Sequence, residues 1–266
     1  MVMSFAQLSY RESLRDIEFC LAAMQSKLYH CGIKNKVARN TLAKANEKRP
    51  WKIYAEFAQV LINTAVPLYK GESHLATELK TIVYAFDSTI IDLCANLFPW
   101  AKFRSTVNAI KVHVLLNIDG SIPEFVSITE ANRQDVKLLD EITYASGCFY
   151  LIDKAYMDFR RLYKMELAKA FFVTRAKENL AYCVTTTNKI NKSEGIKRDE
   201  LIRLKWHHGK RKYPIVFRRI QYHDPLTKKD LTFITNHLTI EPLTVARLYK
   251  ERWKVELFFK LSLIHI

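Results

Sequence analysis

Strand-forming segments begin at about residue 80, and they constrain the fold of this chain more than any other feature. The run TIVYAFDSTIIDL (81–93) is dense in β-branched and aromatic residues, which favour buried strands. VNAIKVHVLLNIDG (107–120) and PEFVSIT (123–129) follow, and Asp119-Gly120 between them is a hairpin-turn signal. We therefore predict three successive antiparallel strands.

After residue 130 the pattern alternates between helix and strand. We expect a helix over 135–145, a strand over 148–153, a helix over 158–168 and a strand over 170–176. This alternation is typical of an α/β protein in which helices cover both faces of a mixed sheet with parallel neighbours. The predicted fold class is therefore α/β.

Two further segments complete the second part of the chain. Residues 180–237 hold short β-type runs among polar turns and many basic residues, which indicates a β-rich insertion. Residues 241–260, EPLTVARLYKERWKVELFFK, return to a helical pattern. We assign 79–266 to one domain, a catalytic core that contains the insertion.

The first 78 residues have helical spacing instead. Leu14, Ile17, Leu21 and Met24 recur at helical intervals, and two further helices are expected within 37–49 and 51–65. Three short helices with basic connections suit a segment that docks on DNA, although the same pattern suits any small helical bundle.

The charge balance favours a polyanionic partner. The chain carries 42 Lys and Arg against 27 Asp and Glu, a formal net charge of +15. Basic side chains that neutralise phosphates release condensed counterions, so nucleic acid is the favoured partner over a merely solvated basic surface. The five cysteines lack metal-ligand spacing, and no window resembles a signal peptide or a membrane span. We expect a cytoplasmic protein with buried free thiols.

Three acidic residues far apart in sequence are the candidates for catalysis. Asp87 lies within the first strand, Asp153 ends a later strand, and Glu256 lies on the last helix. Neighbouring parallel strands bring the first two together, and a helix that packs across them brings the third. Carboxylates a few Å apart repel one another unless cations such as Mg²⁺ lie between them. Two such ions activate a nucleophile and stabilise the leaving oxygen in phosphodiester chemistry.

Each acid also has a purely structural interpretation. Asp87 precedes Ser-Thr and suits a turn or helix cap, Asp153 has Lys154 beside it, and Glu256 lies four residues after Arg252 in salt-bridge spacing. Other acids compete for the same places: Asp92, Asp119, Asp135 and Asp158.

The last helix has two patterned faces. Tyr249, Arg252 and Glu256 are three and four residues apart, so they share one face. This face would present two phosphate-binding groups beside one metal ligand. Trp253 and Leu257 form a neighbouring stripe that we expect to pack on the core, with Lys260 extending to solvent.

These motifs together resemble the bacterial insertion-sequence transposases of the DDE type, in the group with the Y-R-E-K signature (insertion sequence family four, related to the Tn-five transposase). The matching stretches are AFDSTIIDLCANLFPWAKFR, IKVHVLLNIDGSIPEFVSIT, Asp153-Lys154-Ala155-Tyr156 and LYKERWKVELFF. The second-acid motif of that group usually reads Asp-Arg-Gly-Tyr. The resemblance covers nearly the whole chain, and its ordered set of motifs is specific.

The resemblance implies a ribonuclease-H-like core in which Asp87, Asp153 and Glu256 bind two Mg²⁺ ions, with Mn²⁺ as a possible substitute. It implies cut-and-paste transposition: hydrolysis at the element's end, a hairpin intermediate, and strand transfer into target DNA. The implied partners are double-stranded DNA, the terminal inverted repeats and a second copy of the chain in a homodimeric synaptic complex. The implied location is the nucleoid.

DNA-contacting residues follow partly from the resemblance and partly from charge. In relatives the signature Tyr and Arg contact phosphates near the cleaved end, a role carried onto Tyr249 and Arg252, and Lys260 is a further candidate. For a base-stacking aromatic we weigh Trp206 and Phe233 and favour a core role for both. The densest basic run is the other candidate for phosphate contact, against a solvated face: Lys205, Lys210, Arg211, Lys212, Arg218 and Arg219.

Both ends of the chain depart from the family pattern. The signature lysine is replaced by Leu263, and the last six residues, LSLIHI (261–266), match the translation of an adapter used in DNA library preparation. We expect these six residues to be adapter-derived and the chain to be a fragment truncated at both ends, which puts its activity in doubt. The alternatives are a catalytically inactive DNA-binding fragment that occupies element ends and a structure-selective nuclease with the same core.

Overall fold

The computed structural model describes the chain except for residues 94–107, 191–194, 206 and 264–266, and it omits the side chains of 207, 208, 210 and 263. The described chain divides into two compact units. The first comprises Met1–Leu61 with Lys260–Ile266, and the second Ile62–Phe259. The predicted boundary at 78/79 and the expected DNA-binding role of the first segment stay predictions.

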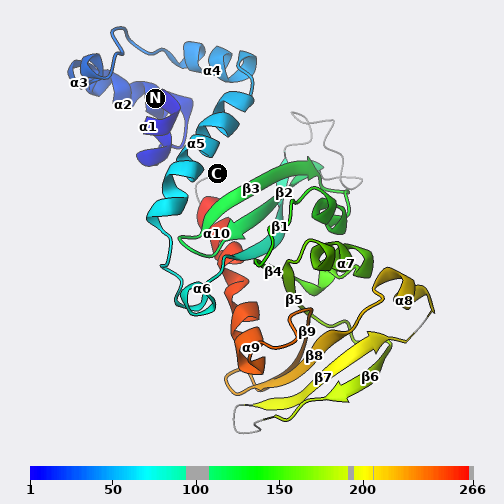
Figure 1. Cartoon of the computed structure of the whole chain (residues 1–266). Helices are drawn as coiled ribbons and strands as arrows, with labels where there is room; N and C mark the ends of the chain where they lie inside the picture. The colour runs from blue at the N-terminus through cyan, green and yellow to red at the C-terminus, as the bar shows by residue number, and fades with distance from the viewer. Residues whose placement is uncertain (94–107, 191–194, 206, 264–266) are drawn as a thin grey trace. The chain divides into compact units, whose positions relative to one another are not determined.

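The first unit is helical (Figure 1). Ile17 and Leu21 are buried, as their spacing predicted, whereas Met24 is exposed. The hydroxyl of Ser13 accepts a hydrogen bond from the Asp16 amide and so caps α2. The pattern located α2, α4 and α5 but missed the short α1 and α3. The helices of this segment are α1 (Val2–Leu8), α2 (Leu14–Ala23), α3 (Gln25–His30), α4 (Arg39–Lys48) and α5 (Lys52–Leu68), the last of which continues into the second unit.

The second unit is built on one nine-stranded mixed sheet, in the order β3-β2-β1-β4-β5-β9-β8-β7-β6 (Figure 1). The predicted α/β class is confirmed, since helices pack on both faces of this sheet. The strands are β1 (Val83–Leu93), β2 (Asn108–Asn117), β3 (Ile122–Glu130), β4 (Phe149–Ile152), β5 (Phe171–Arg175), β6 (Tyr182–Thr187), β7 (Ile196–Leu204), β8 (Phe217–Asp224) and β9 (Lys229–Thr235). The helical elements are α6 (His74–Leu79), η1 (Asp135–Asp140), η2 (Lys154–Tyr156), α7 (Phe159–Leu167), α8 (His207–Lys212), α9 (Pro242–Glu251) and α10 (Trp253–Leu263), the end of which joins the first unit.

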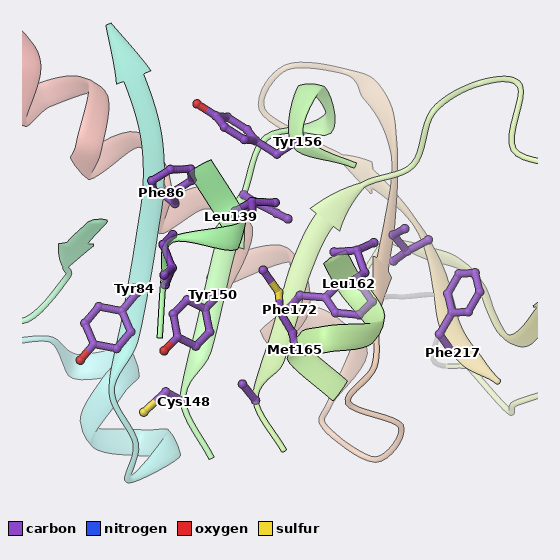
Figure 2. Packing of buried hydrophobic residues seen from close by; sticks show 14 of the residues in the cluster. Tyr84, Phe86, Leu139, Cys148, Tyr150, Tyr156, Leu162, Met165, Phe172 and Phe217 are labelled. Carbon is purple, nitrogen blue, oxygen red and sulfur yellow. The ribbon is translucent and has the colours of Figure 1, made fainter. Parts of the chain in front are cut away.

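Strand β1 separates two hydrophobic layers because its side chains alternate between the faces of the sheet. Tyr84 and Phe86 point into a layer that includes buried residues of η1 and α7, shown in Figure 2. Val83 and Ala85 point the other way, into a layer that includes buried residues of α6, α9 and α10. The two faces of β1 are therefore covered by different helices.

The predicted β-rich insertion is not separate from the core sheet. Its last strand, β9, pairs antiparallel with β5, and β8, β7 and β6 continue outward from it. The insertion thus extends the sheet beyond the parallel strands β1, β4 and β5.

Two local predictions were wrong. The helix expected over 135–145 is only the 3₁₀ helix η1, which ends at Asp140, and Leu138, Leu139 and Ile142 are all buried. The stripe of Trp253 and Leu257 faces solvent, with 65% and 54% of each residue exposed. Val255 and Phe259 pack on the core instead.

The cysteines in the described part of the chain are free thiols, and Cys94 lies outside it. The expectation that they are buried is wrong for most of them: Cys148 is buried, Cys20 is half-buried, and Cys31 and Cys183 are exposed. No helix among the described residues is long and apolar enough to cross a membrane. Of the expected adapter-derived tail, residues 264–266 lie outside the described chain.

The turn after β2 provides a test of local packing. Gly120 has a left-handed φ of +67°, and a Cβ there would lie 2.5 Å from the Cβ of Tyr69. We predict that Gly120→Ala lowers the free energy of unfolding by about 2–3 kcal/mol, measured by urea denaturation, from backbone strain and overpacking together. Gly147 is the matched control, since it also has positive φ but open space around its Cβ position. Equal losses for both variants would show that the Tyr69 contact contributes nothing.

Candidate active site

The register of the parallel strands places the first two acids side by side. The β1–β4 ladder pairs Ala85 with Leu151 and ends with Phe86 opposite Ile152, so Asp87 and Asp153 are the next residues on the two strands. Neighbouring strands lie about 4.8 Å apart. Ala85 and Leu151 both belong to the layer covered by α9 and α10, so the two acids emerge on that face of the sheet.

Helices α9 and α10 bring the remaining predicted residues to this point. The hydroxyl of Tyr249 donates to Asp153 Oδ1 over 3.2 Å. Arg252, at the junction of the two helices, donates from Nη1 to Asp87 Oδ2 (2.8 Å) and from Nη2 to Glu256 Oε1 (2.6 Å). The five predicted residues thus form two hydrogen-bonded groups at the ends of β1 and β4. One group joins Asp153 to Tyr249, and the other joins Asp87 and Glu256 through Arg252.

The charges of the three acids influence one another. The pKa of Asp87 is raised, first by burial and further by the negative charges of Asp153 and Glu256, against the opposing effects of the Ser88 amide and Arg252. Asp153 and Glu256 are therefore both close enough to Asp87 for their charges to act on it. Burial disfavours the charge of Arg252, but its hydrogen bond to Glu256 and the charge of Asp87 outweigh burial and raise its pKa.

The donor set fits a hard divalent cation, although its present arrangement is not a coordination site. Within the described residues no three His, Cys, Asp or Glu side chains are grouped as metal ligands. The guanidinium of Arg252 instead bridges Asp87 and Glu256, and its buried Nε has no hydrogen-bond partner. Carboxylate oxygens are the ligands that Mg²⁺ prefers. Burial and, to a lesser extent, the charges of Asp153 and Glu256 raise the pKa of Asp87, and a bound cation would offset both effects.

The three acids also make some of the structural contacts that the sequence allowed. Glu256 does pair with Arg252, as its spacing allowed, but this pair is only partly exposed because Arg252 is buried. Asp153 accepts from the Ala155 amide and begins η2, and Asp87 accepts from the Ser88 amide. The competing acids have other roles or stay apart: Asp119 accepts from the amides of Gly71 and Ser73, Asp158 caps α7, Asp135 pairs with Lys111, and Asp92 is exposed further along β1.

A cavity of about 740 Å³ opens beside Asp153, between the end of β5 and the strands of the insertion. Its basic lining residues are Lys154, Arg175, Lys177 and Arg219. Arg219 lies over the ring of Tyr182, 5.0 Å from its centroid, and pairs with Glu200. Two acids, Glu178 and Asp230, also line the cavity, but Asp230 is paired with Lys197.

Arg175 is the residue that the sequence analysis missed. The β4–β5 ladder pairs Leu151 with Val173, so Arg175 is in register with Asp153. Its positive charge acts on Tyr249, and within the described chain its guanidinium has no ion-pair partner. The signal was present in the sequence, because a basic residue at the end of the strand expected over 170–176 reaches the same sheet edge as Asp153.

The other predicted DNA-contacting residues are dispersed. Arg211 and Lys212 are exposed on α8, while the side chain of Lys210 and all of Trp206 lie outside the described residues. Lys260 belongs to the first unit and is exposed. One expectation was wrong: Arg218 is buried in a bidentate ion pair with Asp199 and cannot reach a phosphate. Phe233 is buried against Tyr249, so its expected core role is confirmed.

The raised pKa of Asp87 predicts that this residue destabilises the fold. A raised folded-state pKa gives stability that is present below the ordinary value and is lost as the pH rises through the folded value. We predict that Asp87→Asn raises the melting temperature at pH 8 by about 2–4 °C, as expected for a gain of about 1 kcal/mol in a domain of this size, and that the gain shrinks toward pH 4.

Asp224→Asn is the control of opposite sign. The pKa of this exposed carboxyl is lowered by its hydrogen bond from the Thr227 hydroxyl, so its neutralisation should lower the melting temperature at pH 8. Differential scanning calorimetry across this pH range measures both variants. A fall in melting temperature for Asp87→Asn at pH 8 would contradict the conclusion that burial and the neighbouring acids disfavour the charge of Asp87.

The sequence of the chain is similar to known protein families and to named proteins. Residues 78–262 match the family described as "Transposase DDE domain", and residues 1–34 match a "Domain of unknown function (DUF4372)". A protein of Sinorhizobium fredii (strain NBRC 101917 / NGR234) named as transposase y4zB is 32% identical over 82% of this chain and 60% of its own length. A Geobacillus stearothermophilus protein, named as a transposase for insertion sequence element IS5377, is 24% identical over 83% of this chain and 57% of its own length. The chain thus spans less than two thirds of either relative, and it belongs to the DDE transposase family.

Proposed function

We propose that this chain is the catalytic part of an insertion-sequence transposase that uses Asp87, Asp153 and Glu256 to cleave and rejoin DNA phosphodiesters. The observation that carries the proposal is the meeting of Asp87 with Asp153 and Glu256, whose charges act on it, beside Arg252 and Tyr249 at the ends of two parallel strands. A repulsive cluster of this kind is unfavourable for folding and is typical of catalytic sites.

The proposed reaction is cut-and-paste transposition of an element of the Y-R-E-K group. Water hydrolyses one strand at the element's end, and the freed 3′-hydroxyl attacks the opposite strand, so that a hairpin forms and the flanking DNA leaves. Hydrolysis opens the hairpin, and the same hydroxyl then attacks target DNA. Every step exchanges one oxygen for another at phosphorus, so a single site serves all of them.

The three acids would hold two Mg²⁺ ions, or Mn²⁺ in their place, which supply nucleophile activation and stabilisation of the leaving oxygen. Arg252 would then exchange partners. It neutralises Asp87 and Glu256 in the structure, and with metal and DNA bound its planar guanidinium is free to donate to phosphate oxygens. Tyr249 stays protonated for the same purpose, because burial raises its pKa to about 12.

The cavity beside Asp153 supports a DNA strand as the substrate. Arg175 and Lys154 lie next to the acid, and within the described chain neither side chain has an ion-pair partner. We propose that they hold phosphates next to the scissile one, with Arg211, Lys212, Lys210 and Lys260 as further contacts. We also propose double-stranded DNA with terminal inverted repeats as the partner, a homodimer in the synaptic complex, and the nucleoid as the place of action.

The alternative is a catalytically inactive protein that occupies element ends. The Arg252 bridge favours this alternative, because Arg252 binds Asp87 and Glu256, two of the three proposed metal ligands. Metal binding distinguishes the two functions.

Removal of an acid tests the catalytic assignment. We predict that Asp153→Asn or Glu256→Gln lowers Mn²⁺-dependent nicking of an end-bearing DNA at least a thousandfold, about 4 kcal/mol of transition-state stabilisation, and leaves DNA affinity within about threefold. Glu251→Gln is the control, since Glu251 pairs with Lys254 on the same helix pair and lies outside the group of acids. Metal-dependent nicking by either acid variant at the unaltered rate would remove that residue from the triad.

Arg175 tests the proposed strand path. We predict that Arg175→Ala weakens DNA binding about tenfold, ~1.4 kcal/mol for one charged hydrogen bond, and reduces the salt dependence by about one phosphate contact. Affinities at several NaCl concentrations give both values. The matched control is Arg203→Ala, which removes an exposed arginine on β7 that does not line the cavity. Equal losses for the two variants would show only a general effect of charge.

A further inference from the structure

Behind the acids, on the opposite face of β1, a chain of polar side chains joins four elements, with Tyr156 and Lys111 buried and Ser88 and Asp135 half-buried. The Tyr156 hydroxyl of η2 donates to Ser88 Oγ of β1 over 3.0 Å. Ser88 Oγ in turn donates to Asp135 Oδ1 of η1 over 3.1 Å. Lys111 of β2 completes the chain with an ion pair to Asp135 of 2.8 Å.

Each of the two hydroxyl groups in this chain donates to one acceptor. Burial raises the pKa of Tyr156 far above its ordinary value, so its hydroxyl is a proton donor under all working conditions. Asp135 accepts from Ser88, which leaves the lone pairs of the serine oxygen to accept from Tyr156. The imidazole of His113 lies 4.0 Å from Asp135, but burial lowers its pKa to about 4, so Lys111 is the cation that balances the carboxylate.

The two ends of this chain adjoin the two strand acids. Ser88 directly follows Asp87, and Tyr156 ends the single turn of η2 that Asp153 begins. The backbone pairing of β1 with β4 stops at Phe86 and Ile152, so this ladder does not link the two acids directly. Asp87 is still held from the other side, where β1 pairs with β2 and Asp87 lies opposite Val114. On this face the two segments are linked by the hydrogen bond from Tyr156 to Ser88 and by the contact of the Tyr156 ring with Phe86, which Figure 2 shows in the same layer.

We propose that Tyr156 and Ser88 are positioning residues that set the separation of Asp87 and Asp153, with Asp135 and Lys111 as their anchor. The inference rests on the proposed role of the two acids as metal ligands. Neither residue contacts the substrate. They act through the backbone, because a shift of η2 relative to β1 would move one carboxylate away from the other. Outer partners of this kind typically change metal affinity about 10–100-fold when removed.

The test measures metal affinity instead of activity. Mn²⁺ binding to the whole chain is followed by isothermal titration calorimetry for Tyr156→Phe, Ser88→Ala and the double variant, with the melting temperature of each. We expect Mn²⁺ affinity to fall about tenfold in each single variant and no further in the double variant, since both remove one shared bond.

The matched control is Tyr150→Phe. Tyr150 lies in the same hydrophobic layer, and its hydroxyl is also hydrogen-bonded, to the Ala145 amide, but it pairs with Tyr84 at the other end of the ladder from the acids. Equal losses of Mn²⁺ affinity in Tyr150→Phe and Tyr156→Phe would overturn the proposal, as would unchanged affinity in Ser88→Ala. Asp87→Asn and Asp153→Asn distinguish failure of the proposed function from failure of the positioning role. If these two variants bind Mn²⁺ like the natural chain, the proposed function fails. If they lose Mn²⁺ affinity while Tyr156→Phe and Ser88→Ala keep it, only the positioning role fails.

Discussion

The parallel register of β1, β4 and β5 is the constraint on which the site depends. The carboxyl ends of parallel strands lie at one edge of a sheet, where ligands of α/β proteins commonly bind. Here that edge presents Asp87, Asp153 and Arg175 on successive strands, two anions and a cation within a few strand spacings. A shift of one residue in either ladder would turn a side chain to the opposite face. The hydrophobic residues that fix the register therefore also fix the chemistry.

Repulsion between the acids has to be balanced within the protein, and Arg252 provides the balance. Its side chain is buried, it lies at the junction of α9 and α10, and it donates to Asp87 and Glu256 together. A guanidinium suits both states of such a site, because its planar donors match a carboxylate and a phosphate equally well. Under the proposed function, the group that stabilises the acids without substrate is thus the group that receives the substrate's charge.

The sequence predicted the parts of this structure that depend on local patterns. The strands around Asp87 and Asp153 and the helical face of Tyr249, Arg252 and Glu256 follow from spacing alone, and the structure brings these residues together. The contacts that the insertion makes with distant segments could not be predicted from such patterns. Nothing in the pattern of the insertion indicates that β9 pairs with β5, and without that pairing the cavity beside Arg175 has no second wall. The exposure of Trp253 also shows that an apolar stripe on a helix does not identify the face that packs.

The two strand acids differ in access, and the difference gives the direction from which a substrate arrives. Asp87 lies within β1, where burial raises its pKa and Arg252 covers it, whereas Asp153 lines the open cavity. Under the proposed function, a DNA strand in that cavity would contact Lys154, Arg175 and Asp153, which all line it. Because these two cations attract phosphates and Asp153 repels them, the backbone is favoured at the cavity rim until a cation covers the carboxylates. Under the proposed function, metal binding therefore precedes engagement of the scissile phosphate.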